Sequence, residues 1–426
     1  MKKNSMQAVC LLLASVALIL LRGPRLFVEP RFWAEEGTVY FAHAFRTSFL
    51  RNLTTDFFGY YTLVPNLGAG LATLLPLELA PFVTTYLALI IQLLVCSVAI
   101  FGRSFCWDTV PKKLLTVGGV LAISTGDVWL NTINSMYWLA VGTFFILLEQ
   151  SEGQSAPLRL FHRGMLILAG LSGVISCFMT PVFMLKAYRS RQREEWLQAG
   201  ILVLFSLVQL AVLVSSYLSA NPLLGERFTG GEFQWQKILG MHFLAPFLGL
   251  DWLQRDAVLN FDLRFIDFST ALAGDYNPYW SRVSVLLTAA VMVVFFVALI
   301  IKLRKERMVQ EMTASFLLVS VLSTVSSLRM ASGSRYLLAP SAILWTLLLY
   351  AAWKEGFSKW GRGIALLILG IAIAGNAMTY RPKLERYANP DWPKWRDELL
   401  IWRGNSAYEP RIWPLAKEWV MKLGSR

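Results

Sequence analysis

Residues 80–101 read APFVTTYLALIIQLLVCSVAIF, an apolar run that contains no charged side chain. An α-helix needs about 20 consecutive apolar residues to cross the hydrocarbon core of a bilayer, and this run has that length. Comparable runs occur at residues 1–23, 114–126, 138–149, 164–186, 197–216, 284–302, 313–328, 336–352 and 362–379, with a weaker one at 61–77. The sequence therefore predicts an all-α integral membrane protein with about ten or eleven transmembrane helices.

The composition supports this class and argues against nucleic-acid binding. Of the 426 residues, 56% are apolar and only 16% are charged, which is too apolar for a soluble domain. The net charge is +13, but lysine and arginine gather at the ends of the apolar runs rather than in a basic arm. That distribution is typical of positive-inside topology signals. We expect the lipid bilayer, and not a nucleic acid, to be the partner of these charges.

Local motifs for other chemistries are missing from the sequence. Cys10, Cys96, Cys106 and Cys177 are scattered without CxxC spacing, so they predict neither a disulfide framework nor a thiolate metal site. The sequence also has no HExxH, Walker A or GxGxxG motif that would indicate a histidine metal site or a nucleotide site. The basic and apolar N-terminus resembles a signal peptide without a cleavage site, so we expect an uncleaved first helix.

The basic clusters predict the orientation of the chain. Positive-inside bias is strongest in short connections, and three of these are rich in lysine and arginine, around residues 186–193, 302–307 and 354–362. We place them in the cytoplasm, with the basic segments near 112 and 159. The runs 61–77 and 164–186 then cannot both be complete spans. Because 164–186 contains Gly173 and a Thr-Pro step, it could instead form two half-helices.

The polar segments then gather on the exoplasmic side. They are the loops 23–60 and 217–283, the short stretch 326–336 and a tryptophan-rich tail. The chain is thus divided into a transmembrane domain, 1–379, and an exoplasmic tail, 380–426. The tail is too polar to span, and its aromatic residues suit lying on lipid head groups better than stacking on carbohydrate.

An acid pair directly after the first apolar run is the leading catalytic candidate. RFWAEEGTVYF, residues 31–41, places Glu35 and Glu36 among aromatic side chains at the membrane surface. Carboxylates are costly there unless they are solvated, paired or used. A helix starting near Pro30 would put Glu36 and Tyr40 on one face, so that one carboxylate serves as a base while the other orients it or binds a cation. A solvated acidic helix cap is the alternative.

Two further stretches suggest substrate contacts. In GDVWLNTINSMYWLA, residues 126–140, the residues Asp127, Asn131, Asn134 and Trp138 recur at helical spacing, which predicts a polar and aromatic stripe for sugar hydroxyls and a sugar ring. A plain interfacial helix cap would give the same pattern.

The second stretch is SSLRMASGSRYLLAP, residues 326–340, which carries Arg329 and Arg335 beside Tyr336. The guanidinium fork fits phosphate oxygens, although arginines that snorkel at helix ends are common.

Together these stretches resemble the GT-C superfamily of integral-membrane glycosyltransferases. Four segments look more particularly like bacterial members that modify O-antigen or other surface glycans, the serotype-converting glucosyltransferases among them: FWAEEG, NTINSMYW, LSGVISCFMTPVFMLK and GSRYLLAP. The resemblance covers residues 31 to about 340.

The resemblance implies a polyprenyl-phosphate-linked sugar as donor, a surface-glycan or glycolipid acceptor, and inversion at the anomeric carbon. It implies a catalytic acid at Glu35 or Glu36, leaves a divalent cation open, and places the site on the periplasmic side of a bacterial inner membrane. The departing phosphate would need Arg31, Arg329 or Arg335. Two alternatives stay open: a flippase or transporter of lipid-linked glycans, and a ligase or polymerase that uses a lipid pyrophosphate oligosaccharide.

Overall fold

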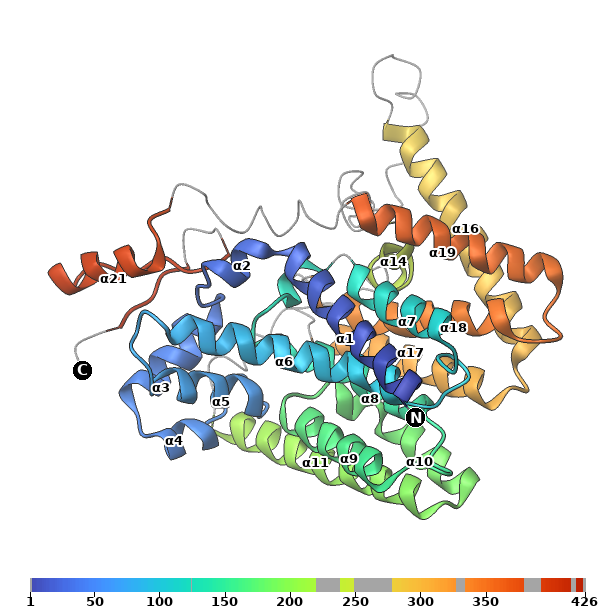
Figure 1. Cartoon of the computed structure of the whole chain (residues 1–426), viewed down its shortest axis with the longest axis horizontal. Coiled ribbons are helices and arrows are strands. Elements are labelled where there is room, and N and C mark those ends of the chain that lie inside the picture. The colour runs from blue at the N-terminus through green and yellow to red at the C-terminus, as the bar shows by residue number, and fades with distance from the viewer. Residues whose placement is uncertain are drawn as a thin grey trace.

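Two largely buried helices, α8 and α18, form the centre of the computed structural model (Figure 1). The structure describes residues 2–123, 125–219, 238–248, 278–326, 334–378, 392–414 and 419–423. The main helices of the bundle are listed here with their bounds: α1 (Lys2–Arg22), α6 (Ala80–Phe101), α7 (Val110–Ala122), α8 (Ser135–Leu148), α9 (Ala156–Leu171), α10 (Thr180–Ser190), α11 (Arg193–Leu218), α16 (Pro278–Leu303), α17 (Arg307–Val325), α18 (Leu338–Trp353) and α19 (Lys359–Met378).

Shorter elements complete the fold, and most of them lie at one end. They are listed here: α2 (Pro24–Val28), the π-helical turn η1 (Glu36–Phe41), α3 (Ala42–Arg46), α4 (Phe49–Thr54), α5 (Leu63–Ala72), the 3-10 turns η2 (Gly126–Val128), η3 (Ser176–Met179) and η7 (Ser334–Leu337), the π-helical turn η4 (Ile238–Leu244), α14 (Ala245–Leu248) and α21 (Trp395–Gly404). The described residues form no strand, only two isolated bridges. The prediction of an all-α fold is confirmed.

The helices have the character of membrane spans. By length and composition, α6, α11, α17 and the segment Arg335–Trp353 could each cross a membrane, and a bent pair of helices could form a fifth span. Large apolar side chains such as Leu204, Leu207 and Leu210 are exposed along α11. Such a surface is stable in lipid and unfavourable in water. The chain is a multi-pass membrane protein, and the predicted number of ten or eleven spans stays a prediction.

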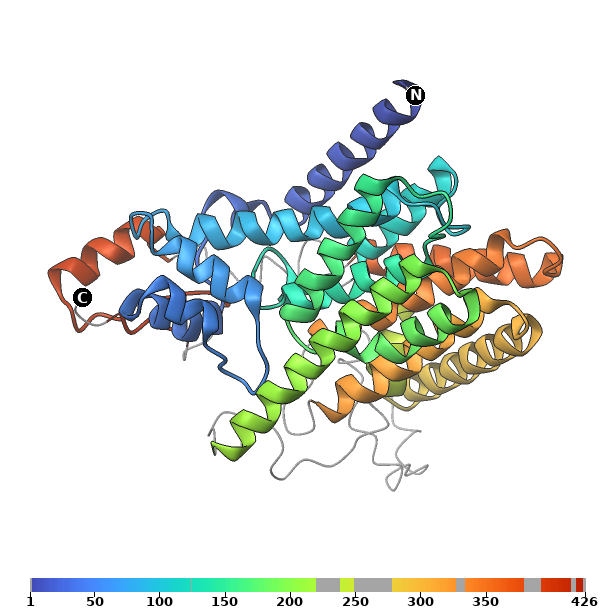
Figure 2. The same cartoon turned by 90° about the horizontal axis from the view of Figure 1, so that it is seen from below.

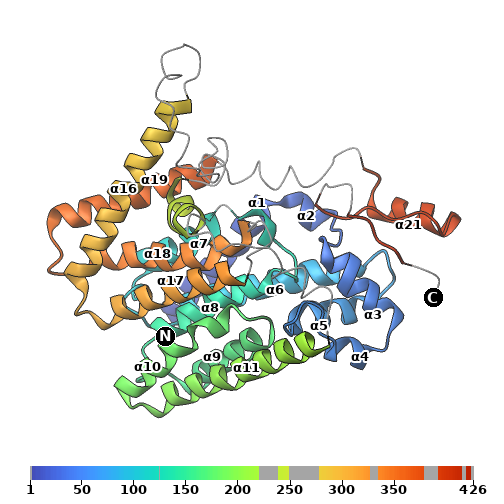
Figure 3. The same cartoon turned by 180° about the vertical axis from the view of Figure 1, so that it is seen from behind.

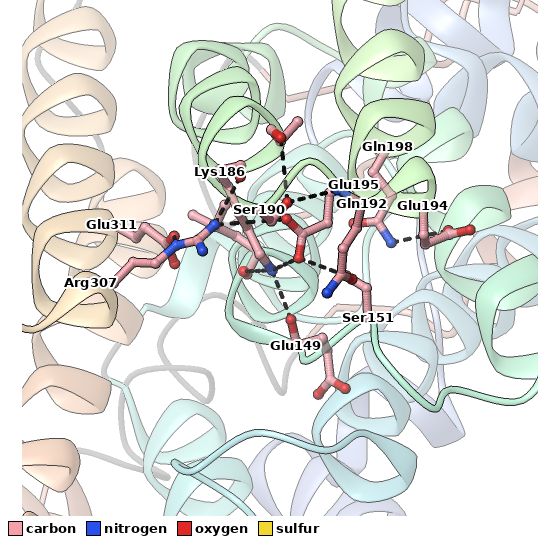
Figure 4. Close-up of polar contacts among 12 residues, drawn as sticks. Glu149, Ser151, Lys186, Ser190, Gln192, Glu194, Glu195, Gln198, Arg307 and Glu311 are labelled. Atoms are coloured by element: carbon pink, nitrogen blue, oxygen red, sulfur yellow. Dashed lines mark hydrogen bonds and ion pairs between the residues drawn. The ribbon is translucent and has the colours of Figure 1, made fainter.

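One end of the bundle holds a network of charged side chains (Figure 4). Lys186 on α10 donates to the carbonyl oxygens of Leu147 and Glu149, each at 2.7 Å, and so caps the C-terminus of α8. Its ammonium also lies 3.6 Å from a carboxylate oxygen of Glu195 on α11. Arg307 lies 3.8 Å from the other oxygen of Glu195. These contacts gather the connections after α8, α10 and α16 at one end, which we call the basic end.

The other end contains the predicted acid pair, and α11 connects the two. This helix starts at Arg193 at the basic end, and near its C-terminus Ser216 donates to Asp56 at 2.7 Å. Its 26 residues extend about 39 Å at 1.5 Å per residue. Figures 1 and 2 show α3, α4, α5 and α21 together at this far end, which we call the acid end.

Residues 156–190 form the two half-helices that the sequence allowed. Helices α9 and α10 are bent by 118° at a short break, so the chain enters the bundle from the basic end and returns to it. The ion pair between Arg163 and Glu194 also places the two flanking segments together. Figure 3 shows α9, α10 and α11 side by side along one flank. The basic segments near 159 and 186 therefore lie at the same end without a complete span between them.

Gly173 makes this break, so its replacement should destabilise the fold. Its φ of +129° is unfavourable for other residues, and a Cβ there would lie 2.7 Å from Met136 Sδ. We expect Gly173→Ala to lower the free energy of unfolding by about 1–3 kcal/mol, measured by thermal denaturation in detergent. Gly164→Ala on α9 is the control, because its Cβ meets open space. Equal stability of the two variants would contradict the backbone argument.

Candidate active site

The acid pair follows an extended segment rather than a helix starting at Pro30. Trp33 pairs with Trp413 of the C-terminal segment, where the Trp413 amide donates to the Phe32 carbonyl at 3.1 Å. Ala34 has a φ of +45°, and helical structure starts only at Glu36 as the π-helical turn η1. The predicted helix start was wrong because a segment almost 400 residues away holds residues 32 and 33 extended.

Glu36 is buried, and hydrogen bonds engage both of its carboxylate oxygens. One oxygen accepts from the Trp33 amide at 3.0 Å. The other accepts from the Thr132 amide at 2.8 Å and from the Thr132 hydroxyl. Burial raises the pKa of Glu36, and these hydrogen bonds oppose the shift. Glu36 therefore joins the turn before η1 to the loop before α8, and protein donors hold both of its carboxylate oxygens.

Glu35 instead lines a pocket at the acid end. Within the described part of the chain, its carboxylate accepts no hydrogen bond and forms no ion pair. Arg335 lines the same pocket, and the two opposite charges interact. The pocket also includes the predicted ligands Tyr40 and Asn134. It encloses about 30 Å³, which is room for about one water molecule, so a sugar could enter only if the pocket widened.

Arg335 brings an uncompensated donor to this pocket. Its Nε is buried and has no hydrogen-bond partner among the residues that the structure describes. Its guanidinium carbon lies 5.6 Å from the centre of the Tyr336 ring. Tyr336 itself is buried and contacts Tyr137 edge to face at 5.3 Å, so it supports the pocket wall. A half-buried guanidinium with an open donor position is suited to bind an oxyanion.

Residues 126–134 form a folded loop before α8 and not the predicted helical stripe. The helix begins only at Ser135, and the side-chain amides of Asn131 and Asn134 each donate to the Asp127 carbonyl at 2.7 Å. Trp138 is buried and donates to the Val128 carbonyl at 2.9 Å. The prediction of one helical face was wrong because these amides hydrogen-bond the backbone, as asparagine often does in turns. Trp138 supports the loop from the interior and has no face open to a sugar.

Arg31 is not brought to the pocket. Arg31 is buried and donates to the Arg411 carbonyl at 2.7 Å and to the Glu398 carboxylate at 3.3 Å, so it contacts the C-terminal segment. Its assignment as a phosphate ligand is therefore corrected to a contact within the protein. Arg329 lies outside the described residues, as does most of the loop 217–283.

Several residues that line the pocket were not among those predicted from the sequence. Tyr137 lies inside the stretch 126–140 but at none of the positions chosen from it, and its buried hydroxyl has no partner among the described residues. Phe58 and Tyr60 also line the pocket, and they belong to the aromatic cluster FFGYY at 57–61. An aromatic cluster in a polar loop is the sequence signal that could have identified Phe58 and Tyr60 as site residues. Among the described residues, no group of three or more histidine, cysteine, aspartate or glutamate side chains is arranged to hold a metal ion.

Comparisons with known proteins give structural similarities only. No protein-family model matches the sequence, and no curated protein matches it. The structure is similar to that of ArnT from Cupriavidus metallidurans bound to undecaprenyl phosphate, with a TM-score of 0.45 and 12% identity over 87% of this chain and 75% of ArnT. It is also similar to the apo oligosaccharyltransferase of Archaeoglobus fulgidus, with a TM-score of 0.47 and 14% identity over 95% of this chain and 58% of that one.

Proposed function

We propose that this chain is a GT-C-type glycosyltransferase that moves a sugar from a polyprenyl-phosphate donor to a surface glycan or lipid-linked acceptor. The observation that carries the proposal is the pocket at the acid end where Glu35 and Arg335 lie together. Among the described residues, the Glu35 carboxylate has no hydrogen bond or ion pair, and the buried Nε of Arg335 has no partner. We further propose that this end faces the periplasm of a bacterial inner membrane, and that O-antigen is the class of acceptor.

The two charged groups suit the two halves of an inverting transfer. As the acceptor oxygen forms its bond to the anomeric carbon, its proton passes to the Glu35 carboxylate, because a hydroxyl is a weak nucleophile until a base removes its proton. The bond from the anomeric carbon to the phosphate oxygen breaks at the same time. The leaving polyprenyl phosphate gains negative charge, which Arg335 stabilises. Tyr40 and Asn134 line the same pocket, and we propose that they contact the substrates when the pocket widens.

A transporter of lipid-linked glycans would need a polar route between the two ends of the bundle. The interior there is formed by α8 and α18, whose buried residues are mainly apolar, SMYWLAVGTFFILL on α8 among them. This favours chemistry at one end over passage through the bundle. A ligase or polymerase would share the acid-end pocket and differ in its donor, a lipid pyrophosphate oligosaccharide. We leave a divalent cation open for either enzyme.

Arg335→Lys tests the phosphate role directly. Lysine keeps the charge but loses the fork that can bind two phosphate oxygens at once. Losing one charge-assisted contact should cost about 1–3 kcal/mol, which is roughly a 5- to 150-fold fall in kcat/KM for the donor. The measurement is transfer from a synthetic polyprenyl-phosphate sugar by protein in nanodiscs.

The control for this experiment is Arg304→Lys, which makes the same change at an exposed position of the basic end. Arg329→Lys is measured in parallel, because we propose the same role for that residue. If Arg335→Lys and Arg329→Lys both keep the wild-type rate and donor affinity, neither arginine binds the donor phosphate.

A further inference from the structure

A buried carboxylate in the C-terminal segment joins that segment to the residues before the acid pair. Glu398 on α21 is fully buried, and its carboxylate lies 3.3 Å from an Arg31 nitrogen and 2.9 Å from Arg411 Nε. The Tyr408 hydroxyl donates to its second oxygen at 2.5 Å. Arg31 also donates to the carbonyl oxygens of Arg411 and Pro393. One carboxylate thus compensates two guanidinium groups, and every group in the set is hydrogen-bonded.

The C-terminal segment also contacts the turn that carries Glu35, through its backbone and its side chains. The Trp413 carbonyl accepts from the Ala34 amide, and the Trp413 amide donates to the Phe32 carbonyl. Beyond the turn, Gly37 packs so tightly against this segment that an added Cβ would lie 2.8 Å from Ile412 Cδ1. Residues on both sides of Glu35 are therefore held by chain that follows the last long helix, α19.

The geometry of this turn explains why it needs such support. Ala34 has a φ of +45°, which is unfavourable for a residue with a Cβ and persists only where surrounding contacts hold it. Glu35 follows it directly, so the φ of Ala34 determines where the Glu35 side chain points. Glu36 fixes the turn to Thr132 on one side, and the C-terminal segment fixes it on the other.

We propose that residues 392–414 are part of the active-site scaffold and that Glu398 is a positioning residue for Glu35. This rests on the proposed function and deepens it, because it makes the tail necessary for transfer rather than a surface anchor. When the Glu398 carboxylate is removed, Arg31 is left as a buried charge without its counter-ion. We expect Arg31 to shift and to release residues 32–34. The Glu35 carboxylate then occupies its working position for a smaller fraction of the time. A displacement of about 1 Å at a reacting group can cost on the order of 10²-fold in rate.

The test is a double-mutant cycle of Glu398→Gln and Glu35→Gln, with transfer measured from a polyprenyl-phosphate sugar in nanodiscs. We expect Glu398→Gln to lower kcat about 10- to 100-fold with KM for the donor nearly unchanged. In the Glu35→Gln background, the same change should have almost no further effect, because the base that Glu398 positions is already gone. Glu409→Gln is the matched control, since Glu409 is a half-buried glutamate of the same segment whose carboxylate lies 3.8 Å from Lys422 Nζ.

The outcomes separate this inference from the proposed function. Full activity of Glu35→Gln would overturn the proposed function itself. Loss of activity in Glu35→Gln with a silent Glu398→Gln, or with losses that multiply in the double variant, would overturn the positioning role alone. Hydrogen exchange at the Ala34 and Trp413 amides gives a readout independent of activity, and we expect faster exchange in Glu398→Gln.

Tyr408→Phe supplies a milder variant in case Glu398→Gln does not fold. It removes one hydrogen bond from the Glu398 carboxylate and leaves every charge in place. A severalfold fall in kcat with unchanged KM is expected, and an unchanged kcat with slow exchange at Ala34 would contradict the inference.

Discussion

Glu35→Gln should abolish most sugar transfer while the protein folds, inserts and extracts into detergent as before. A positioned general base contributes roughly 10²–10⁴-fold to the rate, and an amide cannot take the proton of the acceptor hydroxyl. The folded state should tolerate the change because the Glu35 carboxylate has no hydrogen bond or ion pair within the described part of the chain. The measurement is the initial rate of transfer from a polyprenyl-phosphate sugar, together with a melting curve.

The control for this prediction is Glu29→Gln, which removes a half-exposed carboxylate six residues earlier at the same end of the bundle. It should keep the wild-type rate. A Glu35→Gln protein with full activity would remove the pocket from the account, and a Glu35→Gln protein that does not fold would show that the carboxylate has a structural role.

Glu36→Gln should differ from Glu35→Gln in both measurements. We expect it to lower the stability of the protein strongly and the rate of sugar transfer only moderately. The Glu36 carboxylate accepts from two amides and one hydroxyl, and a glutamine nitrogen in place of either oxygen would face a donor. Each buried donor left unpaired costs about 1–3 kcal/mol. We therefore expect a clearly lower melting temperature than in Glu35→Gln, with activity within about tenfold of wild type when the assay is run well below that temperature.

The comparison between adjacent residues is itself the control, because both changes replace a glutamate by a glutamine in the same turn. If Glu36→Gln were as stable as wild type and lost activity by more than about 10³-fold, Glu36 would be the base and Glu35 would not. The double variant should then be no less active than Glu36→Gln alone.

The general architecture could be predicted because a helix that crosses a bilayer needs an apolar run as long as the hydrocarbon core is thick. Runs such as 80–101 and 197–216 are apolar over a bilayer's thickness, and the structure makes them α6 and α11. The basic clusters only indicated that the runs 61–77 and 164–186 are not both complete spans, and the structure shows two half-helices over 156–190. The predicted helices were wrong where side chains compete with the backbone, as Asn131 and Asn134 do before α8.

The site could be predicted only in part, for a different physical reason. The position of the acid pair after the first apolar run and the guanidinium of Arg335 were both visible in the sequence, and they line one pocket. The different hydrogen bonding of Glu35 and Glu36 was not visible, because it depends on Thr132, which lies far away in sequence. Arg31 was assigned to a phosphate because its partner, Glu398, follows it by more than 360 residues. Local patterns carry no information on such contacts.

The most direct test of the central claim is mass spectrometry of cell-surface glycans from cells that carry the wild-type chain, no chain, or Glu35→Gln. The account predicts that the wild-type chain adds a single sugar to each acceptor unit, and that this mass is missing from the glycans of the other two strains while glycan length and export stay unchanged. A lost polymer would indicate a ligase or polymerase, and a glycan retained inside the cell would indicate a transporter. Either result, or an unchanged sugar addition in the Glu35→Gln strain, would contradict the account.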